Sequence, residues 1–324
     1  MSNLPLASVS LDLDNLWSYQ KTRGDSAWEA RGSYLGRFLP PVLDLLDELN
    51  LKITFFIVGV DAGHAADAAS LSEITRRGHE VGNHSYEHEP WLHTYSPERL
   101  AGEIENAERA IESVTGQRPR GFRGPGYSWS KDLLTVLADR GYTFDASTLP
   151  TWIGPVARWY YFRTSRLSSE EREVRRKLFG GWRDGLRPLK PYRWQLSGSK
   201  SILEIPVTTM PFVRTPFHLS YLLYLSRVSD TLMDAYLRTA LTACRVAGVG
   251  PSYLLHPLDL LGGDQVRELA FFPGMDLTGA RKRELCRRVL GRLSERFTLV
   301  PMSEHARALD AEAGLPLLPI GAPA

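Results

Sequence analysis

Residues 6–15, LASVSLDLDN, are the stretch from which the rest of the chain can be interpreted. Residues 6–11 are short and apolar enough for a buried strand, and two aspartates follow with one leucine between them. Because side chains alternate along a strand, Asp12 and Asp14 would point the same way. Two neighbouring carboxylates are costly unless a metal or another cation compensates them. The alternative is a loop that begins here with both acids solvated.

Short apolar runs and amphipathic stretches alternate along the first 150 residues. We expect strands in the ranges 6–11, 53–58, 79–84, 120–124 and 142–147, and helices in 35–50, 67–77, 96–116 and 130–140. This β-then-α order predicts an α/β fold with a parallel sheet, either closed as a barrel or open and doubly wound. In both architectures the reactive groups belong at the C-terminal ends of the strands.

A basic and aromatic stretch interrupts this alternation. Residues 158–194 hold eleven Lys or Arg against four Asp or Glu, together with eight aromatic residues. The alternation then resumes with expected strands at 201–207, 251–256 and 297–301 and helices at 229–247 and 276–294. We therefore expect one domain over 1–324, with an insertion at about 155–200 and a C-terminal helix-strand extension after about 265.

The composition excludes several classes of protein. With 43% hydrophobic and 23% charged residues, the 324-residue chain is typical of a globular protein, and its net charge of +2 does not favour a nucleic-acid partner. Cys244 and Cys286 are too few for a disulfide framework and are expected to be reduced packing residues. Neither a secretory signal nor an 18-residue apolar run is visible, so we expect a cytoplasmic protein.

Two histidines in HSYEH, residues 84–88, are candidate metal ligands. A four-residue spacing lets His84 and His88 reach one ion from a helical turn or a tight loop. A zinc protease would need glutamate directly after the first histidine, but Ser85 stands there, so that function is excluded. Alone, the pair could equally be two surface histidines. Combined with one aspartate from residues 12–14, it would form a two-His-one-Asp site with open positions.

Two later motifs carry further candidate groups. In GFRGPGY, residues 121–127, Arg123 could neutralise the aspartates, and the glycines would let backbone N–H groups approach a ligand. In SYLLHPLD, residues 252–259, His256 ends an apolar run and is placed as a general acid or base. Separately, an ordinary glycine-proline turn and a structural histidine would explain them equally well.

The four motifs in this order resemble the polysaccharide deacetylase family, carbohydrate esterase family 4. That family has an aspartate pair on its first strand, then H-[ST]-x-x-H, R-x-P and a late L-x-x-H. The resemblance covers about 6–150 and 200–260 and implies an irregular parallel (β/α) barrel. It also implies a divalent metal, most commonly Zn²⁺, and hydrolysis of an N-acetyl or similar N-acyl group on an amino sugar.

The resemblance also implies a role for each matching residue. Asp14, His84 and His88 would bind the metal. Asp12 would be the general base, paired with Arg123, which keeps it ionised. The backbone N–H of Gly126 would stabilise the oxyanion, and His256 would protonate the departing amine. For orienting His256 there are two candidates, Asp145 and Asp259.

The sequence departs from the family pattern at three places. Leu13 separates the aspartates, which many members have adjacent. Gly126 stands where an aromatic residue is common, so that wall of the pocket should differ. The family pairs an aspartate and a tryptophan closely in its fourth motif, whereas Asp145 and Trp152 are further apart here.

The substrate is predicted only by class. The basic, aromatic insertion suggests contact with an anionic lipid-diphosphate carrier of the amino sugar and a peripheral position at the inner face of a membrane; a solvated helical face is the alternative. A deformylase or another C–N amide hydrolase could use the same site. A non-catalytic carbohydrate-binding relative would be expected to have lost a ligand, the base or the acid. A nucleic-acid-binding protein is disfavoured because no binding motif is present.

Overall fold

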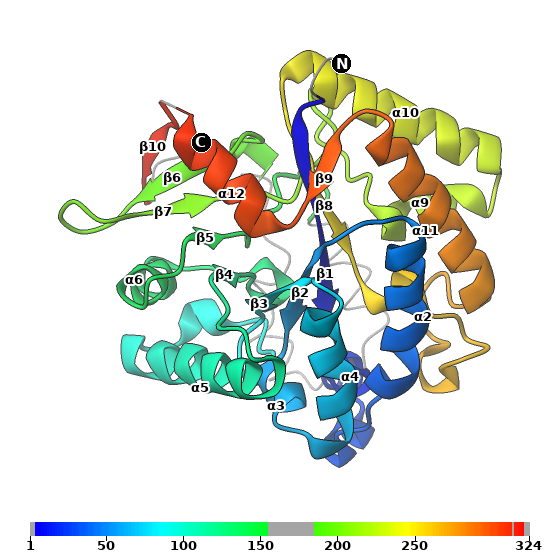
Figure 1. Ribbon diagram of the computed structural model, residues 1–324, viewed down its shortest axis with the longest axis horizontal. Coiled ribbons are helices and arrows are strands. Elements are labelled where there is room, and N and C mark those ends of the chain that lie inside the picture. The colour runs from blue at the N-terminus through cyan, green and yellow to red at the C-terminus, as the bar shows by residue number, and fades with distance from the viewer. Residues whose placement is uncertain (1–3, 155–184, 313, 321–324) are drawn as a thin grey trace.

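The chain forms a curved, mostly parallel sheet surrounded by helices, as Figure 1 shows for a computed structural model that describes residues 4–154, 185–312 and 314–320. The described strands are β1 (Leu6–Leu13), β2 (Thr54–Ile57), β3 (Glu80–Asn83), β4 (Gly121–Phe122), β5 (Phe144–Asp145), β6 (Tyr192–Gln195), β7 (Ser201–Glu204), β8 (Ser252–Leu255), β9 (Thr298–Val300) and β10 (Leu317–Pro319). Their order is β10-β6-β7-β5-β4-β3-β2-β1-β8, with β9 also paired to β1. Neighbours are parallel except β6 with β7.

The two ends of the parallel part approach each other beyond β7. The N–H of Thr208 donates to the carbonyl of Ser252 over 3.1 Å, and the N–H of Ser252 donates to Oγ1 of Thr208 over 2.8 Å. These bonds connect the segment after β7 to the first residue of β8. The expected irregular parallel (β/α) barrel is therefore confirmed.

The strand register brings several strand ends to one level. Leu13 pairs with Ile57, Ile57 with Asn83, Asn83 with Phe122, and Phe122 with Asp145. The residues that directly follow Leu13, Asn83 and Phe122 are candidate site residues. They are Asp14, His84 and Arg123. The C-terminal edge of the barrel thus assembles groups from distant parts of the sequence, because parallel strands end on the same side.

Helices cover the outside of this sheet. The described helices are α1 (Leu16–Arg23), α2 (Leu35–Glu48), α3 (Gly59–Ala62), α4 (Ala65–Arg76), α5 (Pro97–Thr115), α6 (Lys131–Asp139), α9 (Leu219–Ser226), α10 (Asp230–Ala247), α11 (Gly279–Ser294) and α12 (Met302–Ala311). The predicted helix at 96–116 is confirmed: Ser96 caps α5, and Gly116 ends it in the left-handed conformation. Its buried face includes Ile104, Ala107 and Ile111.

The predicted insertion needs one correction. Residues 155–184 lie outside the described part of the chain, but 192–195 form β6, which pairs antiparallel with β7. Tyr192 and Trp194 are buried in the core there, so they are not surface aromatics. Composition alone misplaced them, because a buried strand and an exposed aromatic surface use the same residue types.

The segment after residue 265 is integrated with the barrel. β9 pairs with β1, with Leu6 opposite Thr298, and the imidazole of His305 in α12 lies 3.0 Å from the hydroxyl of Ser8. Cys244 and Cys286 are both free and buried, as expected for packing residues. Among the described helices, none is long and apolar enough to cross a bilayer.

Candidate active site

Three candidate metal ligands meet at the C-terminal edge of β1 and β3. Oδ1 of Asp14 lies 2.9 Å from Nε2 of His88 and 3.3 Å from Nε2 of His84. One ligand atom from each of the three lies within 4.8 Å of the others, and all three side chains are buried. One carboxylate and two imidazoles are a donor set that suits Zn²⁺ and related divalent ions.

The loop that carries the histidines is tightly held and is not helical. Ser85 and His88 both have left-handed backbone conformations, with φ of 62° and 51°. The Glu103 carboxylate of α5 accepts hydrogen bonds from the N–H groups of Tyr86 and Glu87, at 3.0 and 3.1 Å. The tight-loop alternative therefore describes this segment, and the two rings converge because the backbone turns twice between them.

The ring of His84 is oriented by a backbone carbonyl. Its Nδ1 lies 2.7 Å from the carbonyl oxygen of Arg123, so an Nδ1–H there leaves Nε2 with a free lone pair facing Asp14. Burial acts to raise the pKa of Asp14, but His88 and His84 outweigh it and hold that pKa well below its ordinary value. The carboxylate is thus kept ionised, as a metal ligand must be.

Asp12 lies in a second, separate group beside this triad. Its Oδ1 is 3.3 Å from the guanidinium of Arg123, which also donates to the hydroxyl of Ser10 over 3.3 Å. Its Oδ2 is 4.0 Å from Nε2 of His256. Asp12 and Arg123 are buried, whereas His256 is partly exposed. The two aspartates therefore have different partners, although they are two residues apart.

His256 is placed next to Asp259 and not next to Asp145 by the contacts of the described residues. Its backbone N–H donates to Oδ2 of Asp259 over 2.9 Å, and its ring Nδ1 lies 3.9 Å from the same oxygen. The buried ammonium of Lys282 donates to the carbonyls of Leu258 and Leu261, both at 2.7 Å, and so holds the turn that carries Asp259.

Asp145 lies instead in a buried network behind the third motif. The Ser147 hydroxyl donates to Asp145 over 2.5 Å and accepts the N–H of Gly124 over 2.8 Å. Asp145 is the register partner of Glu204, which accepts hydrogen bonds from Thr148. Burial raises the pKa of both carboxyls, and the charge of Asp145 raises that of Glu204 further. Glu204 was not predicted from the sequence, because nothing in its local sequence marks it.

The turn after Arg123 brings an aromatic residue to the site. Gly126 and Tyr127 have φ of 58° and 61°, and the N–H of Tyr127 donates to the carbonyl of Gly124 over 2.9 Å. Burial, and then the charge of Asp12, raise the pKa of Tyr127 well above its ordinary value, so its phenol stays neutral. Tyr127 therefore supplies an aromatic ring one position later than the family pattern has it.

The segment after β1 is fastened to the histidine loop by ion pairs. Lys21 lies 2.6 Å from Glu89, and Arg31 lies 2.9 Å from Glu87. The indole of Trp17 meets the ring of His88 edge-on, with 6.4 Å between centroids. Glu89, which had no role from the sequence, thus belongs to the contact that fixes this loop.

A family comparison agrees with this geometry. Residues 27–144 match the family described as polysaccharide deacetylase. This match identifies a polysaccharide deacetylase domain in the chain. Among curated proteins, it is 34% identical over 103 residues to a chitooligosaccharide deacetylase of Bradyrhizobium sp. (strain ANU 289), covering 32% of this chain and 46% of that protein.

Further similarities extend the comparison. A peptidoglycan-N-acetylglucosamine deacetylase of Bacillus cereus is 32% identical over 88 residues, covering 27% of this chain and 31% of that protein. The chain thus spans less than half the length of these two polysaccharide deacetylase relatives. A crystal structure assigned to the polysaccharide deacetylases, from Mycobacterium smegmatis, superimposes with a TM-score of 0.59 at 18% identity over 97% of both chains. At this identity, the likeness shows a shared fold.

Proposed function

We propose that this polysaccharide deacetylase family member is a metal-dependent hydrolase that removes an N-acetyl or similar N-acyl group from an amino sugar. The observation that carries the proposal is the separation of two buried groups. Asp14, His84 and His88 converge on one point, while Asp12 lies beside them, 3.3 Å from Arg123 and 4.0 Å from His256. Hydrolysis of an amide needs both parts, since its carbonyl is a poor electrophile and its nitrogen a poor leaving group.

Each residue then has one role in the reaction. A divalent ion held by Asp14, His84 and His88, most simply Zn²⁺, would acidify a bound water and polarise the acyl carbonyl. Asp12 takes a proton from the attacking water, and Arg123 holds its carboxylate in place.

Two further groups complete the reaction. His256 delivers a proton to the departing nitrogen, with Asp259 beside its ring to stabilise the imidazolium. The backbone N–H of Gly126 donates to the oxyanion.

Two alternatives use the same residues. A deformylase or another C–N amide hydrolase would differ only in the acyl group. A non-catalytic carbohydrate-binding relative is disfavoured because the residues proposed as ligands, base and acid are all present and lie close to one another. The names of the relatives, chitooligosaccharide and peptidoglycan deacetylases, support an N-acetylated glycan as the substrate class.

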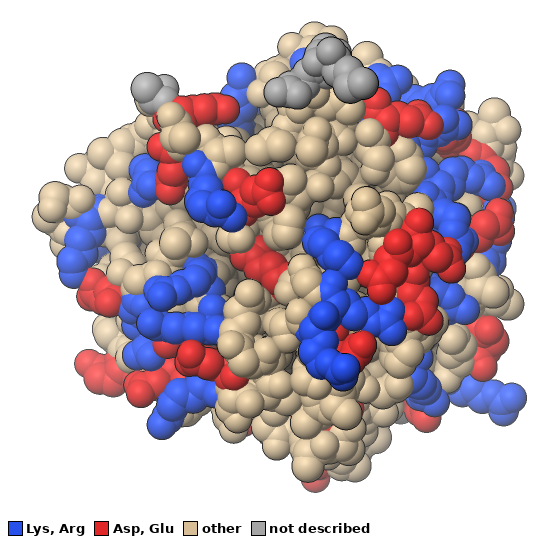
Figure 2. All heavy atoms as spheres, viewed as in Figure 1, with Lys and Arg blue, Asp and Glu red and all other residues tan. Residues whose placement is uncertain are grey.

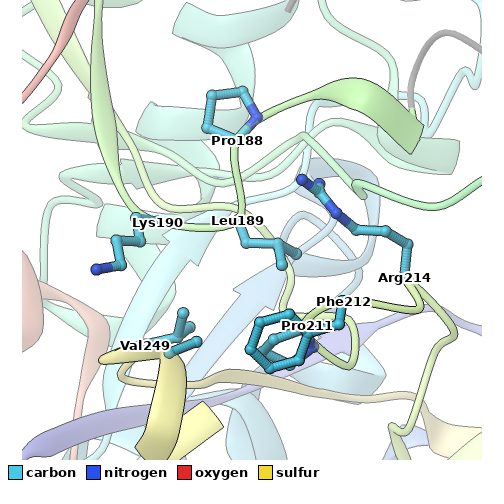
Figure 3. Close-up of a pocket in the computed structure, with 8 residues that line it drawn as sticks. Pro188, Leu189, Lys190, Pro211, Phe212, Arg214 and Val249 are labelled. Carbon is cyan, nitrogen blue, oxygen red and sulfur yellow. The ribbon is translucent and has the colours of Figure 1, made fainter. Parts of the chain in front are cut away.

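A lipid-linked form of the sugar is the second part of the proposal. A pocket of about 460 Å³ is bordered by Lys190, Arg214 and the apolar residue Phe212, as Figure 3 shows. Phe212 is 76% exposed and the adjoining Val213 50% exposed. Exposed apolar side chains beside basic ones suit the surface of an anionic membrane. By contrast, Figure 2 shows Lys and Arg interspersed with Asp and Glu over the face in view.

The loop that presents Phe212 is rigidly held. The N–H of Arg214 donates to the carbonyl of Met210 over 2.8 Å, and the indole of Trp152 donates to the carbonyl of Val213 over 2.7 Å. These bonds keep Phe212 at a φ of 71°, which a bulky residue rarely adopts. A membrane contact through this loop would hold the enzyme peripherally at a membrane surface, which we propose to be the inner face.

A screen for acetate and formate release tests the proposed activity. Monomeric, polymeric and lipid-linked amino sugars are incubated with the full chain, and the metal content of the same sample is measured. Acyl release that requires the bound metal is expected. Metal binding without release from any amino sugar would overturn the proposed activity.

The membrane contact has its own test. Co-sedimentation with vesicles containing anionic phospholipid is expected for the unmodified chain and reduced in the Phe212→Ser variant. Equal binding of both, or of neither, would overturn it without affecting the proposed activity.

A further inference from the structure

A buried histidine that the proposed mechanism does not use lies beside the proposed acid. His218 precedes α9, and its ring centroid is 6.3 Å from that of His256 at an interplanar angle of 54°. Tyr221 packs edge-on against the His218 ring, with 4.8 Å between centroids. The side chain is 3% exposed, so its position is set by packing.

Hydrogen bonds hold the backbone around His218, whereas Nδ1 of its ring lacks a hydrogen-bond partner among the described residues. The N–H groups of Tyr221 and Leu222 donate to the carbonyl of His218, at 3.0 and 3.3 Å, and the phenol of Tyr253 donates to the carbonyl of Phe217. The imidazole makes no capping hydrogen bond to the helix that it precedes. Within the part of the chain that the structure describes, Nδ1 is enclosed and has no hydrogen-bond partner.

The charge state of this ring follows from its surroundings. Burial, and then the neighbouring positive charges of His256 and Arg123, lower the pKa of His218 to about 3. A neutral imidazole has one N–H donor and one acceptor. Because an Nδ1–H would be an enclosed donor without an acceptor, we assign the proton to Nε2. The slight exposure of the side chain then belongs to atoms other than Nδ1.

We propose that Nε2 of His218 donates a hydrogen bond to a substrate oxygen on the side of the site where His256 protonates the departing nitrogen. This inference rests on the proposed function. In an amino sugar, two ring carbons flank the carbon that bears the acylated nitrogen. The oxygens on these two carbons are the sugar oxygens nearest to that nitrogen. His218 thus recognises one of these oxygens and positions the sugar so that the nitrogen faces His256.

A neutral donor suits this task next to an acid. A cation at this position would repel the protonated form of His256 that the reaction needs. A buried donor that waits for its acceptor also discriminates well, since a ligand lacking the oxygen leaves the donor unpaired. Loss of the hydrogen bond from His218 should therefore raise KM and leave the proton transfers unchanged.

The test is a double-mutant cycle between the protein and the sugar. KM and kcat are measured for the unmodified enzyme, His218→Phe and His218→Gln. The substrate is the amino sugar that releases acyl groups, together with analogues that carry hydrogen in place of the oxygen on each flanking carbon. We expect one analogue to raise the KM of the unmodified enzyme by about tenfold, the loss of one hydrogen bond with the donor left unpaired.

The two variants separate recognition from packing. For His218→Phe, the intact sugar should show a similar rise in KM, and the informative analogue should show no further rise. His218→Gln, which retains an N–H donor, should recover part of the affinity. A His218→Phe enzyme that is impaired equally on the intact sugar and on both analogues, or that loses kcat with KM unchanged, would overturn the inference.

A binding measurement keeps this test independent of turnover. The same cycle is measured as Kd for N-acetylglucosamine and its deoxygenated analogues on the metal-loaded Asp12→Asn background. Coupling in Kd without any hydrolysis by the unmodified enzyme would overturn the proposed activity alone, and hydrolysis without coupling would overturn this inference alone. If neither hydrolysis nor sugar binding is found, both are overturned.

A matched control is available at the other end of the barrel. His305 is an equally buried histidine, and its Nδ1 contacts Ser8 near the start of β1, far along the strand from Asp12. The His305→Phe variant should show the same KM values and the same coupling as the unmodified enzyme. A similar loss of coupling in this control would mean that the effect is one of core packing.

Discussion

The guanidinium of Arg123 lies 3.3 Å from the carboxylate of Asp12, and both side chains are buried at the edge of the ligand triad. A buried carboxylate that is held by Arg123 and has the His256 ring 4.0 Å from its other oxygen, beside the candidate ligands and not among them, is well suited to accept a proton.

Asp12→Asn should therefore abolish hydrolysis while the metal stays bound. Asparagine keeps an oxygen for Arg123 but cannot accept the proton of the attacking water, so kcat should fall by about 10² to 10⁴. Acyl release and metal content are measured on one preparation. Full activity of this variant would show that Asp12 is not the base.

His84→Ala should lose the metal. Removing one of three protein ligands leaves the carboxylate of Asp14 and one imidazole, which bind a divalent ion much more weakly. Metal content after dialysis is the measurement. The matched control is His64→Ala, because the His64 side chain is half exposed and pairs with Asp67 outside the triad. A metal content that falls equally in both variants would argue against the assigned ligands.

Asp259→Asn and Asp145→Asn should separate the two candidates for orienting His256. In the first variant, the side-chain amide oxygen can still accept the N–H of His256, but the negative charge beside the imidazole is removed, so kcat should fall by about tenfold or more. In the second variant, the amide can still bond to Glu204 and Ser147, so kcat should change little. Steady-state kinetics of both variants decide the matter, and the reverse order of effects would assign the orienting role to Asp145.

Glycine substitutions should distinguish the two glycines of the third motif. A Cβ at Gly124 would lie 2.0 Å from the carbonyl oxygen of Ser128, so Gly124→Ala must displace backbone. At Gly126 a Cβ would lie 3.0 Å from Cβ of Pro90, in a left-handed conformation that costs about 1 kcal/mol.

Thermal unfolding should accordingly rank Gly124→Ala as much less stable than Gly126→Ala. Gly102→Ala is the control, because its Cβ would meet nothing within 4 Å in α5 and alanine favours a helix by about 0.8 kcal/mol. An equal loss of stability at 124 and 126 would contradict the contact assigned to Gly124.

The stability of the protein should decrease in mild acid, partly through His305. Burial lowers the pKa of His305 to about 4, whereas the ordinary value of a histidine is 6.5. Between these two pH values the unfolded chain binds one more proton than the folded chain, so stability falls as the pH falls from 6.5 to 4.

The effect amounts to about 1 kcal/mol of unfolding free energy per pH unit from this side chain. Urea unfolding at several pH values, compared between the unmodified chain and His305→Gln, measures it. The variant should show a shallower dependence on pH, and parallel curves for the two proteins would contradict the prediction.

The site residues at strand ends could be predicted from the sequence. Two patterns suffice for them, the alternation of strands and helices and the order of the motifs. Alternating strands and helices imply a parallel sheet, and the C-terminal ends of parallel strands lie at one edge. Asp14, His84 and Arg123 each follow a strand directly, so the topology alone brings them together. The same alternation indicated a parallel sheet, either closed or open. The order of the motifs indicated the family, and that resemblance implied the barrel.

The tertiary structure alone decided which partners these residues have. His256 meets Asp259, whereas Asp145 pairs with Glu204, a choice that depends on how β5 and β7 are aligned and not on sequence spacing. His218 follows no recognisable motif and reaches His256 only because the chain folds back before α9. The contacts of a buried polar side chain depend on distant segments of the chain, and its local sequence carries no record of them.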